Sequence, residues 1–215
     1  MKLPPSKILN NSNLLHALIR TLRDPETHSL AFREAVEQIG IALASEVLQS
    51  LATKETSVTT STGGQATHHI VDQLPVLATI LRAGLPLLQG VQRIFPRAEV
   101  GFFAASRDEH TAQAKTDYVA LPNVRGRTVI LVDTMLATGG SALDALRIIE
   151  RQNPKEVIVL AAIAAERGIQ RIKEFNSTIR VIAAVIDPVL NDRSFIVPGL
   201  GDAGDRSYGA KCELS

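Results

Sequence analysis

The sequence predicts an α/β protein in which a parallel β-sheet is flanked by helices. Two observations predict this fold class. From residue 75 onward, apolar runs of strand length alternate with segments of helical periodicity. These runs are continuously apolar, as in "VILV" at 129–132, and such strands are typical of a parallel sheet that is covered on both faces.

Two amphipathic helices are expected before the first strong strand signal. The first spans residues 13–23, with Asn13 as a candidate N-cap. Its shared apolar face is formed by Leu14, Leu18 and Leu22. The second helix spans 30–49, with Ser29 as the candidate N-cap, and its apolar residues recur every three or four positions.

Residues 53–69, "TKETSVTTSTGGQATHH", predict a β-hairpin arm. β-branched residues stand on both sides of Gly63-Gly64, which is the pattern of two strands joined by a tight turn. The alternative for so polar a segment is a disordered linker.

The alternating part of the chain follows the arm. Strands are expected at 75–84, 98–106, 126–133, 155–165 and 179–187. Helices are expected at 85–95, 141–153 and 167–175. No repeat and no low-complexity tail divides the chain, so we expect one domain over residues 1–215.

The composition limits the possible functions. A net charge of +1 argues against a nucleic-acid binder with a broad basic surface. No apolar run reaches the ~18 residues expected of a membrane span, and the N-terminal segment lacks the apolar core of a secretory signal. The single cysteine, Cys212, cannot form an internal disulfide, which fits a reducing, cytoplasmic location.

The stretch "VILVDTMLATGGSA" at 129–142 lies where a ligand site is expected. Its strand ends at Asp133, and a helix is predicted to begin near Ser141. The loop between them therefore follows the carboxyl end of a parallel strand, where open sheets of this kind bind ligands.

The residue types of this loop predict a phosphate cup. Gly139 and Gly140 let the backbone approach an anion, the helix N-terminus offers unpaired N–H groups, and Thr138 and Ser141 add hydroxyl donors. Asp133 would repel phosphate but suits sugar hydroxyls or a metal ion, so the ligand is predicted to be a phosphorylated sugar. The Walker lysine and the G-x-G-x-x-G pattern are absent, and a simple tight turn is the alternative.

Four segments, in order, resemble the type I phosphoribosyltransferases. The loop "DTMLATGGS" at 133–141 resembles their phosphoribosyl-pyrophosphate loop, in the version of the uracil phosphoribosyltransferase family. "ILRAG" at 80–84 resembles the pyrophosphate loop, and "SRDEHT" at 106–111 resembles the flexible loop. "FIVPGLGDAGDRSYG" at 195–209 resembles the uracil-binding tail and is the most specific of the four.

The resemblance implies a reaction and a set of site residues. Uracil and 5-phosphoribosyl 1-pyrophosphate (PRPP) would give UMP and pyrophosphate, with Mg²⁺ bound together with PRPP and no metal site formed by the protein alone. The 5′-phosphate would bind at 137–141, and residues 187–215 would form a base-binding hood. Asp202 and Arg107 are the implied catalytic residues. The implied PRPP-binding residues are Arg82, Arg107, Asp133, Thr134, Met135, Leu136, Ala137, Thr138, Gly139, Gly140, Ser141 and Asp202. The implied uracil-binding residues are Ile196, Gly201, Asp202 and Ala203.

The chain departs from the family pattern at several positions. The departures are Ser106 and Phe195 for Tyr, His110 for Glu, Ala120 for Lys and Thr134 for Pro. A non-catalytic protein that binds PRPP or a uridine nucleotide and regulates another process is the alternative function, and a transferase for another base is a third. The long N-terminal helices and the arm suggest a homodimer, which could pair into a tetramer, and the resemblance makes GTP a possible effector.

Overall fold

The computed structural model describes residues 7–8, 12–107 and 114–211, with backbone alone at 7–8, 105–107 and 114–117. Its centre is a seven-stranded sheet. In sheet order the strands are β1 (Lys7–Ile8), β9 (Arg180–Asp187), β8 (Glu156–Ala165), β7 (Thr128–Leu136), β4 (Val76–Leu81), β5 (Val100–Arg107) and β6 (Ala114–Ala120). All neighbours are parallel except β5 and β6. The predicted fold class is confirmed, and the edge strands β1 and β6 are additions to it.

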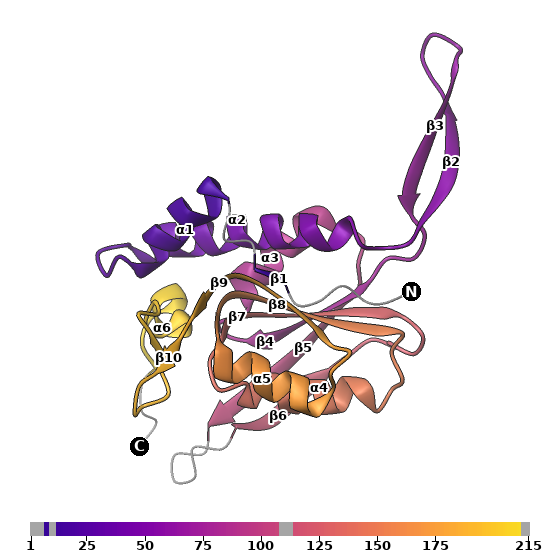
Figure 1. The fold of residues 1–215 in the computed structure, drawn as a ribbon. Helices are drawn as coiled ribbons and strands as arrows, with labels where there is room; N and C mark the ends of the chain where they lie inside the picture. Colours follow the sequence, from indigo (N-terminus) through magenta and orange to yellow (C-terminus); the bar gives the residue numbers. More distant parts are fainter. Residues whose placement is uncertain (1–6, 9–11, 108–113, 212–215) are drawn as a thin grey trace.

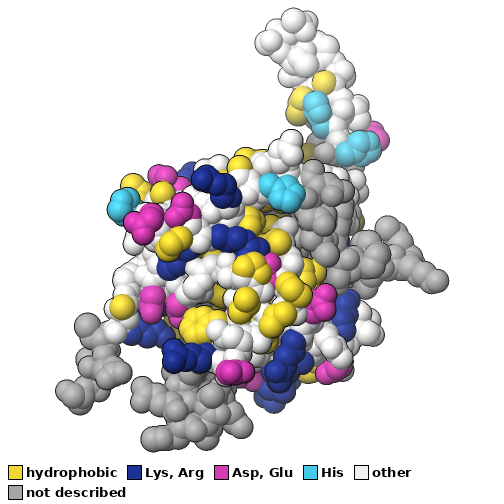
Figure 2. Space-filling view, turned by 60° about the vertical axis from the view of Figure 1, so that its left-hand side comes forward, with side chains coloured by type: hydrophobic (Ala, Val, Ile, Leu, Met, Phe, Trp, Pro, Cys, Tyr) yellow, Lys and Arg dark blue, Asp and Glu magenta, His cyan; other side chains and the backbone are white. Residues whose placement is uncertain are grey.

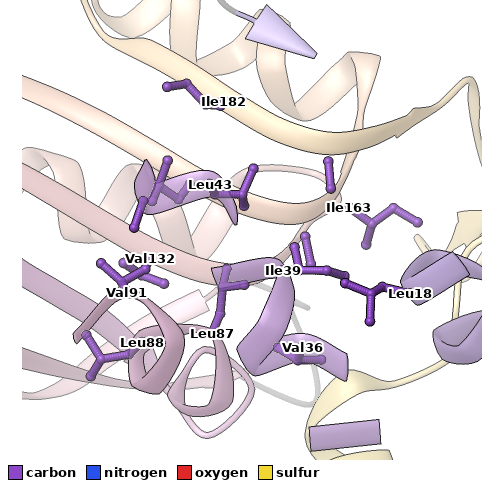
Figure 3. Close-up of a cluster of buried hydrophobic side chains, with 14 of the residues drawn as sticks. Leu18, Val36, Ile39, Leu43, Leu87, Leu88, Val91, Val132, Ile163 and Ile182 are labelled. Carbon is purple, nitrogen blue, oxygen red and sulfur yellow. The ribbon is translucent and has the colours of Figure 1, made fainter. Parts of the chain in front are cut away.

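Helices cover both faces of the sheet, as Figure 1 shows. One face carries α1 (Asn13–Arg23), α2 (Ser29–Leu48) and α3 (Leu85–Ile94), and the other carries α4 (Gly140–Glu150) and α5 (Glu166–Phe175). The side chains of β7 alternate accordingly: Ile130 and Val132 pack in the cluster with α2 and α3, and Val129 and Leu131 pack in the cluster with α4. Figure 3 shows Val132 among side chains of α2 and α3.

The N-terminal helices differ in detail from the prediction. Ser12, and not Asn13, caps α1, because its hydroxyl accepts a hydrogen bond from the Leu15 N–H at 3.4 Å. Leu14 is 54% exposed, and the buried face of α1 consists of Leu15, Leu18, Ile19 and Leu22. The N-cap of α2 is His28, and its side chain makes no capping bond.

Two glycines let α2 and α3 pack at close range. A Cβ at Gly90 would lie 1.9 Å from the Glu37 carbonyl oxygen, and a Cβ at Gly40 would lie 2.4 Å from the Leu87 carbonyl oxygen. The backbones of the two helices therefore touch where any side chain would separate them. This contact fixes α3, which follows the loop that contains Arg82.

Gly90→Ala is therefore expected to lower the free energy of unfolding by about 1–3 kcal/mol, because the added methyl group must push the helices apart. Denaturant unfolding measures this. Gly64→Ala is the matched control, since its Cβ would meet only Thr60 Oγ1 at an ordinary 3.5 Å. Equal stability of the two variants would contradict the close packing.

Residues 53–71 form the predicted hairpin arm and not a linker. Strands β2 (Thr53–Thr59) and β3 (Gln65–Val71) pair antiparallel, and the arm projects away from the body in Figure 1. In Figure 2, histidine side chains lie in the half of the arm nearer the body, in agreement with the pairing of His68 with Thr56.

The C-terminal hood follows β9 and contains β10 (Val189–Leu190), β11 (Ile196–Val197) and α6 (Ala203–Tyr208). Asp187 attaches it: this carboxylate is 3% exposed, accepts from Arg23 at 2.7 and 2.9 Å, and accepts from the Gly199 N–H at 2.8 Å. Because the hood is tied to α1, we infer that it belongs to one domain with the sheet. Among the described residues, no helix is long and apolar enough to cross a membrane.

Candidate active site

A cavity of about 230 Å³ lies at the carboxyl edge of the sheet. Three segments line it: residues 80–83 at the end of β4, residues 133 and 135–142 from the end of β7 to the start of α4, and parts of the hood. Figure 1 shows the hood beside this end of the sheet. The cavity thus brings together the predicted pyrophosphate loop, phosphate cup and uracil-binding tail, which are far apart in the sequence.

The phosphate cup begins where β7 ends. Gly139 adopts φ +78 and is the N-cap of α4, which begins at Gly140, one residue before the predicted start. The predicted members that line the cavity are Asp133, Met135, Leu136, Ala137, Thr138, Gly139, Gly140 and Ser141. Backbone N–H groups at the start of this three-turn helix can receive a phosphate.

Helix α5 supports the cup from behind. A Cβ at Gly168 would lie 2.5 Å from the Ala137 carbonyl oxygen, so only glycine lets α5 approach the loop this closely. Arg171 adds a hydrogen bond from Nη1 to the Thr138 carbonyl oxygen at 2.9 Å. The shape of the cup is therefore set by α5 as well as by its own sequence.

Asp133 stands at the end of the cavity near β7. Burial raises the pKa of Asp133 to about 7, although backbone N–H groups of Met135 and Thr134 donate to the carboxylate and act in the opposite direction. A carboxylate at this place can accept hydrogen bonds from sugar hydroxyls. Its protonation state changes close to neutral pH.

Thr134 does not line the cavity. Its side chain is buried, and its hydroxyl donates to the Ala83 carbonyl oxygen at 2.6 Å. The predicted contact with PRPP is thus replaced by a bond between the phosphate loop and the pyrophosphate loop. A proline, which the family pattern has here, has no hydroxyl to make this bond.

Arg82 lines the cavity, as predicted for a diphosphate contact. Its Nη2 pairs with Asp205 of the hood at 3.0 Å, and both side chains are just over one-third exposed. Arg107 is the last residue of β5, and its side chain and residues 108–113 lie outside the described residues. The role of Arg107 stays a prediction.

The hood contributes Gly201, Asp202 and Ala203, the predicted uracil-binding residues, to the lining of the cavity. Asp202 is also the N-cap of α6, because its Oδ1 accepts from the Asp205 N–H at 2.9 Å. Ile196 does not line the cavity, and its side chain is buried in the core at 3% exposure. Its predicted uracil contact would have to come from the backbone.

Five hood residues that were not predicted also line the cavity: Arg193, Ser194, Phe195, Gly204 and Lys211. Arg193 and Lys211 add positive charge on the hood side. Phe195 was noted only as a replacement for tyrosine. The residues around Arg193 do not predict that it belongs to the site, because Arg193 reaches the cavity only when the hood folds back over the sheet.

The fold and the site together define a type I phosphoribosyltransferase: an open α/β sheet with a glycine-rich phosphate cup, an arginine loop beside it and a hood across the cavity. Comparison with known proteins narrows this class. The uracil phosphoribosyltransferase family matches residues 9–210, and the chain belongs to this family.

Individual relatives agree with the family match. The uracil phosphoribosyltransferase of Clostridium beijerinckii is 39% identical over 204 residues, which cover 94% of this chain and 97% of the relative. That of Halalkalibacterium halodurans is 37% identical over 199 residues, covering 92% and 95%. Among solved structures, the AQ2163 protein of Aquifex aeolicus superposes with a TM-score of 0.87 at 35% identity, covering 94% of this chain and 98% of that one.

Proposed function

We propose that this protein transfers the phosphoribosyl group of PRPP to uracil. The bond between C1′ of the ribose and the diphosphate oxygen breaks, a bond from C1′ to N1 of uracil forms, and N1 loses its proton, which gives UMP and pyrophosphate. The observation that carries the proposal is that the phosphate cup, Arg82 and the hood line one cavity. Each part of the two substrates can therefore face cavity residues that suit its chemistry.

The phosphoribosyl group binds on the side of the cavity that the sheet forms. The 5′-phosphate binds at the backbone N–H groups and hydroxyls of 137–141, and Asp133 accepts from the ribose hydroxyls. Arg82, together with Arg107, binds the diphosphate, because guanidinium groups pair with phosphate oxygens in bidentate fashion. Positive charge there favours departure of the diphosphate as C1′ becomes cation-like.

Uracil binds on the side of the cavity that the hood forms. One edge of uracil presents an acceptor, a donor and an acceptor, which backbone N–H and C=O groups of Gly201, Ala203 and Ile196 can match. Asp202 lies close enough to the cavity to contact the sugar or to receive the N1 proton. Cytosine inverts part of this pattern, and a buried site of this kind can reject such an analogue by about 10⁴-fold.

A divalent cation fits this site only when it is bound together with PRPP. Among the described residues, no group of three or more His, Cys, Asp or Glu side chains could hold a metal ion. The cavity has the carboxylates of Asp133 and Asp202, and Mg²⁺ commonly takes one or two carboxylates with phosphate oxygens and waters. Because Asp133 is assigned to the ribose hydroxyls, Asp202 would hold Mg²⁺ carried by PRPP, and the ion would supply positive charge to the diphosphate.

The pKa of Asp133 predicts a pH dependence. Only the ionised carboxylate accepts from both ribose hydroxyls, so we expect kcat/KM for PRPP to fall as the pH drops through about 7. Asp133→Asn should lower kcat/KM for PRPP and should remove the fall in kcat/KM near pH 7 that Asp133 causes. The effect of the titration of PRPP itself remains in the pH profiles of both wild type and variant. An unchanged fall in the variant, or an unchanged affinity for PRPP, would contradict the assignment.

The same pKa predicts an effect on stability with a defined sign. Because the folded-state pKa lies above the ordinary value of 3.8, the stability that protonated Asp133 contributes is lost as the pH rises from about 4 through about 7. Asp133→Asn should therefore raise the free energy of unfolding at pH 8, by up to roughly 4 kcal/mol, and change it little at pH 4. Denaturant unfolding at the two pH values measures this, and a variant less stable than wild type at pH 8 would contradict it.

The direct test is turnover. Labelled uracil, PRPP and Mg²⁺ should give UMP, whereas cytosine and adenine in parallel should not. Tight PRPP binding without turnover of any base would favour the regulatory alternative, which none of the relatives supports by its name. Turnover of another base in place of uracil would overturn the role of the hood.

We further infer that the protein is a cytoplasmic homodimer, with a homotetramer as the larger assembly to test. The arm of residues 53–71 supports this, because it projects from the body and most of its residues are exposed, where a second copy of the chain could contact them. Sedimentation at several protein concentrations tests the assembly. GTP stays a possible effector, and adding it to the turnover assay tests this.

A further inference from the structure

The ion pair between Arg82 and Asp205 joins the two walls of the cavity. Arg82 comes from the loop after β4, and Asp205 comes from α6 in the hood, 123 residues later in the sequence. The Arg82 Nη2–Asp205 Oδ1 distance is 3.0 Å, and Arg82 Nη1 also donates to the Gly209 carbonyl oxygen at 3.5 Å. The arginine assigned to the diphosphate is thus held by the segment assigned to the base.

Helix α6 is a fixed support for this pair. Arg206 packs over the ring of Phe32 with its guanidinium carbon 4.4 Å from the ring centroid. It also donates to three backbone carbonyl oxygens, those of Leu22, Asp24 and Leu200. Arg33 of α2 donates to the Ser207 carbonyl oxygen at 2.7 Å. Because α6 is tied to α1 and α2, Asp205 is a stationary partner for Arg82.

Asp205 acts on Arg82 from outside the cavity. Arg82 lines the cavity, together with Gly201 to Gly204, whereas Asp205 does not. A guanidinium has five N–H donors, and the described bonds to Asp205 and Gly209 occupy two of them. The remaining donors are available to a diphosphate while the ion pair persists, so ligand and Asp205 need not compete.

We propose that Asp205 is a positioning residue that orients Arg82 toward the diphosphate of PRPP. This inference rests on the proposed function, since it presupposes that PRPP binds in the cavity. It assigns to the hood a part in binding PRPP, in addition to its part in binding uracil. The carboxylate acts through its hydrogen bond to Arg82, not through its charge, which by itself repels diphosphate.

Calorimetric titration of variants with PRPP and with UMP tests this. UMP has the 5′-phosphate and the base but no diphosphate, so it reports on the cup and the hood without Arg82. We expect Asp205→Ala to raise the Kd for PRPP about tenfold or more and to leave the Kd for UMP within about twofold. Asp205→Asn keeps an oxygen that accepts from Arg82, so it should bind PRPP nearly as tightly as wild type.

A double variant and a control complete the test. If Asp205 acts through Arg82, Arg82→Ala/Asp205→Ala should bind PRPP no more weakly than Arg82→Ala alone. Asp144→Ala, which removes a surface ion pair with Arg147, should change neither Kd.

Three results would overturn the proposal: PRPP binding by Asp205→Ala as tight as that of wild type, an equal loss of UMP and PRPP binding, or additive effects in the double variant. Wild-type protein that binds neither ligand would instead contradict the proposed function, so the two failures are distinguishable.

Discussion

Gly168→Ala is expected to weaken the binding of both PRPP and UMP by about 10–100-fold, the loss expected when a shifted cup no longer makes one hydrogen bond to the charged phosphate. Its Cβ would lie 2.5 Å from the Ala137 carbonyl oxygen and 2.9 Å from that of Leu136. The backbone of the phosphate cup must therefore shift away from α5. Because both ligands have a 5′-phosphate, both should lose affinity, as calorimetric titration will measure.

Gln170→Ala is the control for this variant, since Gln170 is exposed on the same helix and pairs only with Glu174 among the described bonds. It should bind both ligands like wild type. If Gly168→Ala bound UMP with wild-type affinity, the 5′-phosphate would not lie in the cup at 137–141.

Asp187→Ala is expected to lower the free energy of unfolding by about 3–5 kcal/mol, the usual cost of breaking a buried ion pair from one side. The change removes the partner of Arg23 and leaves the Gly199 N–H without its acceptor. Because Gly199 lies between Ile196 and Gly201, which are both assigned to uracil, UMP binding should weaken as well. Denaturant unfolding and UMP titration measure the two effects.

Asp72→Ala is the matched control for Asp187→Ala. Asp72 pairs with Lys54 at 3.4 Å where both side chains are 56% exposed, and such pairs contribute about 0–1 kcal/mol. An equally small effect of Asp187→Ala would mean that the hood is attached to the body by other contacts.

The parts of the fold that could be predicted are those whose signals are local. Neighbouring residues alone predict three features: the continuous apolar strands, the turn at the glycine pair of the arm, and the phosphate cup between Asp133 and Ser141. The caps of α1 and α2 were assigned one residue too late. Ser12 and Asn13 are neighbouring residues that are both of capping types, and His28, which caps α2 without a side-chain bond, is not of such a type.

The parts that could not be predicted depend on partners distant in sequence. Thr134 was expected to touch PRPP, but its hydroxyl bonds to Ala83, 51 residues away. Asp187 is only the last residue of a predicted strand, and its partner Arg23 is 164 residues away. Similarly, the sequence gives no sign that Arg193 folds back onto the cavity. Composition and periodicity do not contain such pairings, which exist only once the sheet and the hood have come together.

The most direct test of the central claim is a crystal structure of the protein with UMP. We expect the phosphate at the backbone N–H groups of 137–141, the ribose hydroxyls at Asp133 and the uracil edge against Gly201 and Ala203 of the hood. A nucleotide bound in the opposite direction, or outside the cavity that these segments line, would contradict the account.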